Sequence, residues 1–89
     1  ADLTNLLSSI EESRVSVLFV EHSKSKTKIS WRSVPGVDVS VLAAEYDGGG
    51  HPAAAGAELN KSLQETETLV VARTLAFLQS IDRGEKGEI

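Results

Sequence analysis

Leucine and isoleucine recur at intervals of three and four residues at the start of the chain. The positions are Leu3, Leu6, Leu7 and Ile10, and this spacing is typical of one face of a helix. We therefore expect a short amphipathic helix over residues 2–11, with its leucine side buried against a core.

Two strand-like segments follow. Residues 14–22, RVSVLFVEH, are rich in β-branched and aromatic side chains, which predicts a central strand covered on both faces. Residues 26–32, KTKISWR, alternate between polar and apolar side chains, so that Arg32 lies on one face with the lysines and Trp31 lies on the other. Because only a short polar linker separates the two segments, we expect a hairpin.

A second helix and a third strand surround a glycine-rich segment. Asp38 can cap the helix, whose apolar stripe runs from Val39 to Tyr46. Gly48 falls where a glycine commonly ends a helix. Residues 53–59, AAAGAEL, predict a short strand of small side chains that another backbone or a bulky group can approach closely.

The end of the chain carries the signals of a long helix. Ser62 and Glu65 have the spacing of a capping box. The apolar stripe after them predicts a helix that ends near Gly84. Its expected buried side is formed by Val71, Leu75, Leu78 and Ile81.

The order of these segments predicts one α/β domain of the α+β type, in which helices pack on a single small mixed sheet. We assign residues 1–89 to this domain, and their 40% of hydrophobic residues is ordinary for a globular protein. The chain has no cysteine, which excludes thiolate metal sites and disulfides. It also lacks an apolar run of the roughly 20 residues that span a bilayer, so we expect a cytoplasmic protein without membrane contact.

The glycine-rich segment is a candidate anion site. The formal net charge of −4 disfavours non-specific attraction of nucleic acid, so a polyanion needs a local patch. In GGGHPAAAG, residues 48–56, three glycines allow backbone N–H groups to converge on an anion, and His51 can donate a hydrogen bond to a phosphate oxygen. On spacing alone, an equally good interpretation is that Gly48 caps a helix and that the next two glycines form a flexible turn before a solvated histidine.

This segment resembles the GGGHxxAAG signature of the DHH-associated domain (GGGH type). That domain is the C-terminal substrate-binding lobe of the DHH (Asp-His-His) phosphoesterases, which include oligoribonucleases and nucleoside-bisphosphate phosphatases. The upstream stretch ISWRSVPGVDVSVLAAEYDGGGH is also similar to the family pattern, and the likeness extends from about Leu3 to Leu59. In this family an N-terminal lobe holds divalent metal, usually manganese, and hydrolyses phosphoesters.

The resemblance implies that this domain binds the phosphate of a nucleotide or a short single-stranded oligonucleotide. The implied contacts are those of Arg32, Ser33, Gly48, Gly49, Gly50 and His51. The chain has two histidines and no Asp-His-His triplet, so it lacks the family's metal ligands. We therefore expect no catalytic residue or cofactor here, no hydrolysis by this chain alone, and a metal-bearing DHH lobe before it in a longer two-lobe phosphoesterase.

Two other functions stay open. A related glycine-rich lobe contacts RNA or a partner in alanyl-transfer-RNA synthetases and their editing relatives. In a structural or oligomerisation module, the small residues would instead form a packing surface, and the apolar strands would continue across a homodimer.

Several residues carry competing interpretations. Lys24, Lys26 and Lys28 either form a basic stripe that leads a phosphodiester chain toward the glycines or protect an edge strand from aggregation. Trp31 and Tyr46 are expected to pack in the core rather than to stack on bases.

Three ionisable residues are expected to have ordinary roles. His22 is predicted to lie in an exposed loop. Glu45 and Asp47 flank the glycines, and we interpret them as a helix-end acid and a turn acid rather than as a carboxylate pair for metal binding or acid–base chemistry.

Overall fold

The computed structural model describes residues 7–87. These residues form five strands and two helices, and the strands make one sheet in the order β1-β2-β3-β5-β4. The elements are β1 (Leu7–Glu11), β2 (Val15–Ser23), β3 (Lys26–Ser33), α1 (Ser40–Glu45), β4 (Gly49–His51), β5 (Ala54–Leu59) and α2 (Leu63–Gly87). All four strand pairs are antiparallel. The α+β class and the single sheet are therefore confirmed, with antiparallel pairing where a mixed sheet was expected.

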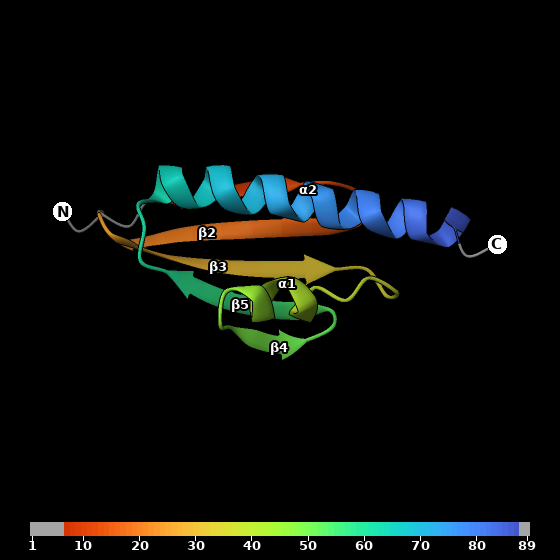
Figure 1. Cartoon of the computed structure of the whole chain (residues 1–89). Helices are drawn as coiled ribbons and strands as arrows, with labels where there is room; N and C mark the ends of the chain where they lie inside the picture. The colour runs from red at the N-terminus through yellow and green to blue at the C-terminus, as the bar shows by residue number, and fades with distance from the viewer. Residues whose placement is uncertain (1–6, 88–89) are drawn as a thin grey trace.

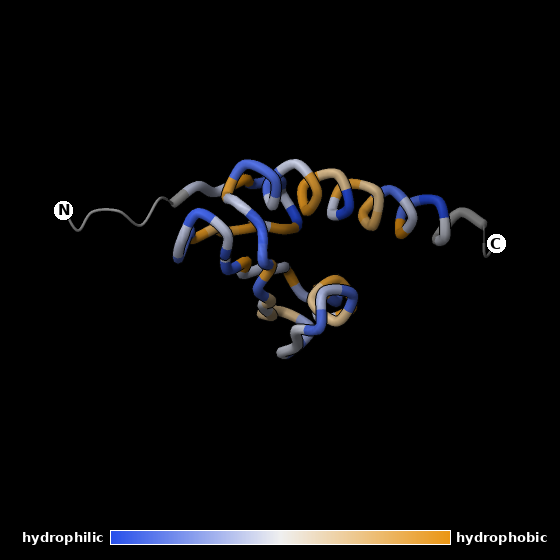
Figure 2. Tube along the Cα trace, turned by 60° about the vertical axis from the view of Figure 1, so that its left-hand side comes forward, coloured by the Kyte–Doolittle hydropathy of each residue, from blue (hydrophilic) through white to orange (hydrophobic). Residues whose placement is uncertain are grey.

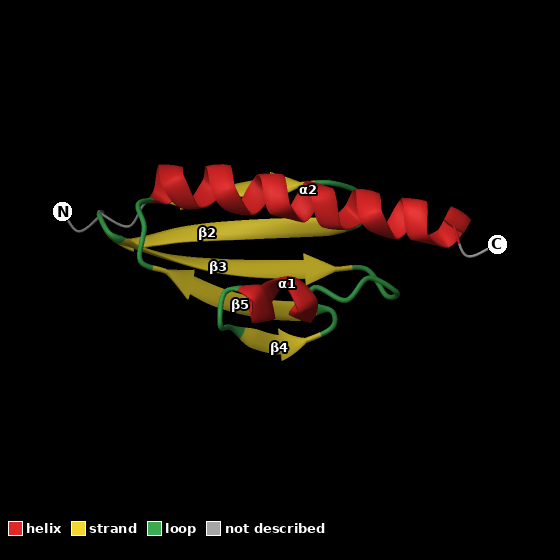
Figure 3. Cartoon of the chain, in the orientation of Figure 1, coloured by secondary structure: helices red, strands yellow, loops and turns green. Residues whose placement is uncertain are grey.

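Both helices lie on the same face of the sheet (Figures 1 and 3). The longer helix, α2, contacts β2 and β3, while α1 contacts β4 and β5. No described element covers the opposite face, which we call the open face. The open face carries Ser16, Leu18, Val20, Lys28, Ser30, Arg32, Ala54, Gly56 and Glu58.

The core lies between the helices and the inner face of the sheet. Trp31 is fully buried there, and its ring stacks on Tyr46 with the centroids 6.1 Å apart. Its indole Nε1 donates a hydrogen bond to Oγ1 of Thr74 in α2 over 3.1 Å. The prediction that Trp31 and Tyr46 serve packing is confirmed. The other buried apolar side chains among the described residues are Val15, Val17, Phe19, Ile29, Val37, Val39, Leu42, Ala43, Ala55, Ala57, Val70 and Leu78.

The buried hydrogen bond from Trp31 to Thr74 predicts a non-additive pair of substitutions. Thr74→Val leaves the indole N–H unpaired in the core, so we expect it to lower the free energy of unfolding by about 1–3 kcal/mol. In a Trp31→Phe background, which has no N–H to satisfy, the same change should cost much less. Urea unfolding followed by circular dichroism measures both costs, and equal costs in the two backgrounds would contradict this role.

The first segment departs from the predicted helix. Residues 7–11 form the edge strand β1, which pairs with β2 so that Ile10 lies opposite Val17. A short segment gains little from forming a helix on its own, and pairing with the nine residues of β2 decides its conformation. The helix prediction is wrong for residues 7–11, and Leu3 and Leu6 lie outside the described residues.

Strand β2 is covered on one face only. Val15, Val17 and Phe19 are buried, whereas Leu18 between them is 38% exposed on the open face. The expected cover on both faces is wrong, because both helices pack on the inner face. The expected hairpin is confirmed by the antiparallel pairing of β2 with β3, in which Val17 lies opposite Trp31.

The predicted capping box is present at α2, whereas the N-cap residue of α1 is Val39 rather than Asp38 and makes no side-chain cap bond. The amide of Glu65 donates to Oγ of Ser62 over 3.1 Å, and the amide of Ser62 donates to Oε1 of Glu65 over 3.3 Å. At α1, the amide of Ser40 donates to Oδ1 of Asp38 over 2.9 Å. Helix α2 continues through Gly84, beyond its predicted end, because a glycine weakens a helix by about 1 kcal/mol without stopping it.

The buried side of α2 matches the prediction at three positions. Leu78 is buried, and Val71 and Ile81 pack against the core with partial exposure. Leu75 is 48% exposed, so its predicted burial is wrong. It lies on the flank of the helix toward β1, where it lines a hollow of about 140 Å³ together with Ile10.

Candidate functional site

The end of α1 places the glycine segment beside the sheet. The amide of Asp47 donates to the carbonyl of Ala44 over 3.1 Å, and the amide of Gly48 donates to the carbonyl of Ala43 over 2.8 Å. This is a Schellman-type helix end. Its left-handed residue is Asp47, with a φ of 64°, and Gly48 follows it. The N–H of Gly48 is therefore used by the helix and is not offered to a ligand.

The other glycines form an edge strand instead of a loop. Gly49, Gly50 and His51 make up β4, which pairs with β5 at the border of the sheet. Of these three residues, Gly50 has a positive φ of 145°. Because successive N–H groups of a strand point to opposite sides, the predicted nest of converging amides is wrong.

Packing explains two of the three glycines. A Cβ on Gly48 would overlap the carbonyl oxygen of Gly56, and a Cβ on Gly50 would lie 2.6 Å from the carbonyl oxygen of Ala54. A Cβ on Gly49 would meet no described atom within 4 Å, and its φ is outside the left-handed region. The fold thus requires glycine at positions 48 and 50, whereas the bare backbone at position 49 stays open to another molecule.

Strand pairing brings Arg32 and His51 to the same part of the sheet. Arg32 of β3 lies opposite Ala54 of β5, and Ala54 lies opposite His51 of β4. Directly opposed residues in an antiparallel sheet send their side chains to the same face. Since neighbouring strands are about 4.8 Å apart, the two backbones are about 10 Å apart. A guanidinium and an imidazole therefore flank one small side chain on the open face.

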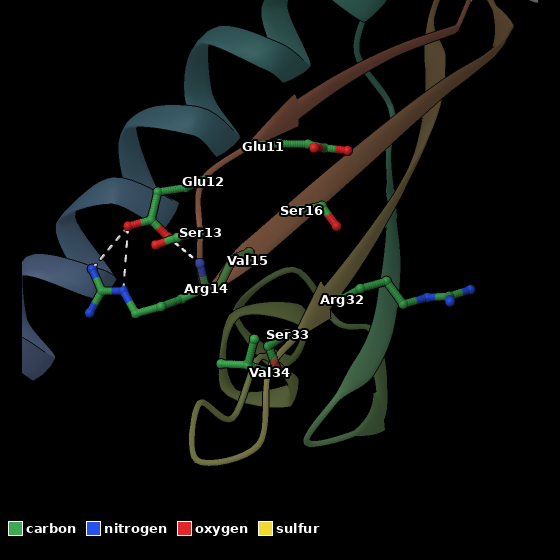
Figure 4. A pocket seen from close by; sticks show the side chains of 9 residues that line it. All are labelled: Glu11, Glu12, Ser13, Arg14, Val15, Ser16, Arg32, Ser33 and Val34. Carbon is green, nitrogen blue, oxygen red and sulfur yellow. Dashed lines mark hydrogen bonds and ion pairs between the residues drawn. The ribbon is translucent and has the colours of Figure 1, made fainter.

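The side chain of Arg32 is exposed and makes no hydrogen bond or ion pair with the side chains that the structure describes. In Figure 4 it points away from Arg14. Arg14 is occupied, because it forms ion pairs with Glu12 over 3.1 Å and with Asp82 over 2.8 Å. Within residues 7–87, Arg32 has no internal partner that an anion would have to displace.

Two shallow hollows of about 250 Å³ each border Arg32. One lies at the end of the β1–β2 hairpin and is drawn in Figure 4. The other lies on the open face over β3, β5 and β4, and small side chains form most of its floor. Its lining consists of Lys28, Ser30, Arg32, Gly49, Ala54, Ala55 and Gly56.

Apart from Lys28, which was considered as part of a basic stripe, four residues that line the open-face hollow were not selected from the sequence as site residues: Ser30, Ala54, Ala55 and Gly56. The alternation of residues 26–32 already placed Ser30 on the face of Arg32, and that signal could have found it. Gly56 reaches the hollow because it lies between Ser30 and Gly49 across three strands. This pairing joins distant segments, and local periodicity does not predict it.

Ser33 lies on the face opposite to Arg32. Its hydroxyl donates to the carbonyl of Val37 over 2.6 Å, and the carbonyl of Pro52 is 3.2 Å away. Its amide donates to the carbonyl of Ala53 over 3.0 Å. These bonds tie the end of β3, which carries Arg32, to the turn that follows His51. Ser33 therefore helps to position Arg32 relative to His51. Direct contact with a ligand remains a prediction for this residue.

The lysines of β3 do not protect an edge. Strand β3 is the third of five strands in the sheet, so the interpretation of Lys26 and Lys28 as edge-strand residues is wrong. Lys28 lines the hollow beside Arg32. The central strand places Lys28 and Arg32 on an uncovered face, although the chain as a whole is acidic, and Glu58 of β5 lies directly opposite Lys28 and offsets part of its charge.

The acids near the glycines are not arranged as a pair. Glu45 accepts two hydrogen bonds from the guanidinium of Arg73 in α2, each over 2.7 Å, and these bonds lower its pKa. Asp47 occupies the left-handed position after α1. The predicted roles as helix-end and turn acids are confirmed. His22 lies in β2 rather than in a loop, with Nδ1 3.4 Å from Oε2 of Glu58.

The ion pair between Glu45 and Arg73 predicts a small pH effect. Because the folded-state pKa of Glu45 is lowered from 4.5, its contribution is present above that value and is lost as the pH falls through the folded pKa. Both side chains are about a third or more exposed, so Glu45→Gln should cost at most about 0.5–1 kcal/mol at pH 7. Urea unfolding at neutral and acidic pH should show this difference shrinking below the unfolded-state pKa, and a constant difference would contradict it.

Residues 7–87 lack two further kinds of feature, a metal-binding cluster and a membrane-spanning helix. These residues contain no group of three or more His, Cys, Asp or Glu side chains placed to hold a metal ion. Neither described helix is both long and apolar enough to cross a membrane.

Comparison with known proteins gives the class of the domain. The family model described as the DHHA1 domain matches residues 1–79, and the chain belongs to this family. The resemblance found in the glycine-histidine segment is therefore confirmed. A curated relative, the "Bifunctional oligoribonuclease and PAP phosphatase NrnA" of Mycoplasma pneumoniae, is 38% identical over 55 residues, which are 62% of this chain. The match covers 17% of that relative, so the chain corresponds to a small part of its length.

Proposed function

We propose that this DHHA1 domain binds the phosphate of a nucleotide or a short single-stranded oligonucleotide on its open face. The observation that carries the proposal is the row Arg32, Ala54 and His51, which crosses three strands beside the bare backbone of Gly49. Arginine grips a phosphate through parallel N–H groups, and an imidazole can donate a further hydrogen bond. Ala54 between them leaves room for the phosphate.

The remaining part of the hollow fits the rest of such a ligand. Lys28 adds a second positive charge four residues before Arg32 on the same strand face. The strand rises about 3.3 Å per residue, so these two cations are about 13 Å apart at the backbone. The small residues Ser30 and Gly56 form the floor between them, where a flat sugar or base can lie against the sheet.

Hydrolysis itself is assigned to a DHH lobe with bound divalent metal, manganese in our proposal. The role of this domain is to orient the phosphate toward that lobe. Holding a substrate in the reactive position supplies a large part of the reduction in activation free energy. The relative's name describes oligoribonuclease and PAP phosphatase activities. A bisphosphorylated nucleoside is accordingly the first ligand to test.

The test is a titration of isotope-labelled protein with adenosine 3′,5′-bisphosphate, followed by amide NMR. We expect shifts that saturate and that concentrate at Arg32, Gly49, Gly50 and His51. Adenosine without phosphate is the matched control and should leave these signals in place. No response at millimolar bisphosphate, or equal responses to both ligands, would contradict phosphate recognition.

A further inference from the structure

The outer side of α2 has an uncharged middle. Between positions 68 and 80 the one charged residue is Arg73, whose side chain is 40% exposed and paired with Glu45 over 2.7 Å, although 25% of the chain is charged. Leu69 is 43% exposed and Leu75 is 48% exposed. Figure 2 shows the apolar colours gathered in the middle of α2 and polar colours toward both ends. The exposed residues of this stretch are Thr68, Leu69, Ala72, Leu75, Ala76, Gln79 and Ser80.

The direction of this surface follows from helix geometry. Thr74 is 5% exposed and accepts the hydrogen bond of Trp31, so it marks the side of α2 that faces the sheet. Each residue of an α-helix is rotated by about 100° around the helix axis from the residue before it. Ala72 and Ala76 therefore both lie within about 20° of the direction opposite to Thr74. The uncharged surface is centred on these two alanines and points away from the sheet and from the open face. Leu75 and Arg73 lie about 100° to either side of Thr74, at the borders of this surface, and Leu75 lines the hollow beside β1.

Charges of opposite sign stand at the two ends of this surface. Glu65 is exposed in the first turn of α2, and Arg83 is exposed near its end. Asp82, next to Arg83, is already paired with Arg14 over 2.8 Å. Consider a second copy related by a two-fold axis that passes α2 on the side opposite Thr74. Each residue would then face the residue that lies equally far from Thr74 in the other copy. The facing pairs would be Glu65 with Arg83, Leu69 with Gln79, and Ala72 with Ala76.

The surface also has space for a second helix. A hollow of about 410 Å³ lies beside the first turns of α2, at the acidic end. Leu69 forms part of its wall, and the alanines further along allow the two helix axes to approach to about 8 Å. The lining of the hollow is Lys61, Gln64, Glu65, Thr68 and Leu69.

We infer that α2 is a homodimer surface, on which the helix of a second copy lies antiparallel. Uncharged and partly apolar residues would fill the centre, and Glu65 and Arg83 would close both ends, as charged rims do in other interfaces. The paired helices would share about 27 Å of length, which is a small interface, so the dimer should be weak and reversible. The inference does not depend on the proposed function, because the open face stays accessible in the dimer.

Sedimentation equilibrium of the full chain from about 10 µM to about 1 mM tests the surface. We expect a reversible monomer–dimer equilibrium. Ala76→Glu places a charge in the uncharged centre and should raise the dissociation constant by at least about tenfold. Ala44→Glu, at an exposed alanine of α1, is the matched control and should leave the equilibrium unchanged.

A charge exchange tests the antiparallel arrangement. Glu65→Arg and Arg83→Glu should each weaken the dimer, and the double variant should restore it, because the opposed charges are then exchanged. Thermal unfolding shows that each variant is folded. A chain that stays monomeric over the whole range, a dimer that tolerates Ala76→Glu, or a double variant no tighter than the single ones would overturn the inference.

Discussion

Gly50→Ala is expected to unfold the domain or to leave it barely stable, whereas Gly49→Ala leaves it intact. Gly50 has a φ of 145°, and a Cβ there would lie 2.6 Å from the carbonyl oxygen of Ala54 and from Cα of Ala55. Backbone strain costs about 1–3 kcal/mol, and overpacking against backbone adds about 1–3 kcal/mol. A small domain has a free energy of unfolding of about 5–15 kcal/mol, so the loss is a large part of the total.

The same change at Gly49 separates fold from function. A Cβ there meets nothing within 4 Å, and a less flexible unfolded chain should stabilise the domain by about 0.4–1 kcal/mol. Thermal and urea unfolding by circular dichroism compare the two variants. If Gly50→Ala were as stable as the wild type, the close packing of β4 on β5 would be wrong. If Gly49→Ala unfolded the domain, the bare backbone at this position would be a requirement of the fold.

Arg32→Ala is expected to cause the largest loss of nucleotide affinity. Hydrogen bonds to a charged group contribute about 1.5–3 kcal/mol, which corresponds to a dissociation constant about 10- to 150-fold higher. Arg32→Lys keeps the charge but not the parallel N–H groups, so it should recover only part of the affinity. The measurement is a titration with adenosine 3′,5′-bisphosphate followed by calorimetry or NMR.

The control for Arg32 removes the same charge elsewhere. Arg83→Ala changes an exposed arginine on α2, which lies on the other side of the sheet. It should leave nucleotide affinity unchanged, because the open face is accessible in both monomer and dimer. At a concentration where the chain is monomeric, both variants should unfold at the wild-type temperature, because neither side chain is buried in the monomer. Equal losses in the two variants would indicate general charge attraction, and unchanged affinity in Arg32→Ala would remove the central contact of the proposed site.

The prediction from sequence succeeded where a signal lies within a few residues. The alternation of residues 26–32 placed Trp31 inward and Arg32 outward, and the capping box placed Ser62 directly before the start of α2 at Leu63. The glycine-histidine segment identified the family. Each of these features depends on neighbouring residues, whose side-chain directions and backbone hydrogen bonds are set by local geometry.

The prediction failed where the outcome depends on distant partners. Residues 7–11 have helical spacing, but β2 offers a strand to pair with. Gly49 and Gly50 read as a loop, yet β5 makes them a strand. Leu75 has the periodicity of a buried residue, but it lines an open hollow beside β1 and is exposed. In each case packing overrides the local pattern, which is short and weak.

The sequence by itself determined the class of the domain and the inner and outer faces of β3, and it supplied the residues that we propose to meet a phosphate. Only the tertiary structure decided that β3 is central, that one face of the sheet stays uncovered, and that Arg32 and His51 flank Ala54. The reason is physical: alternation assigns a side chain to one of two faces, but the order of strands and the position of helices decide which face is buried.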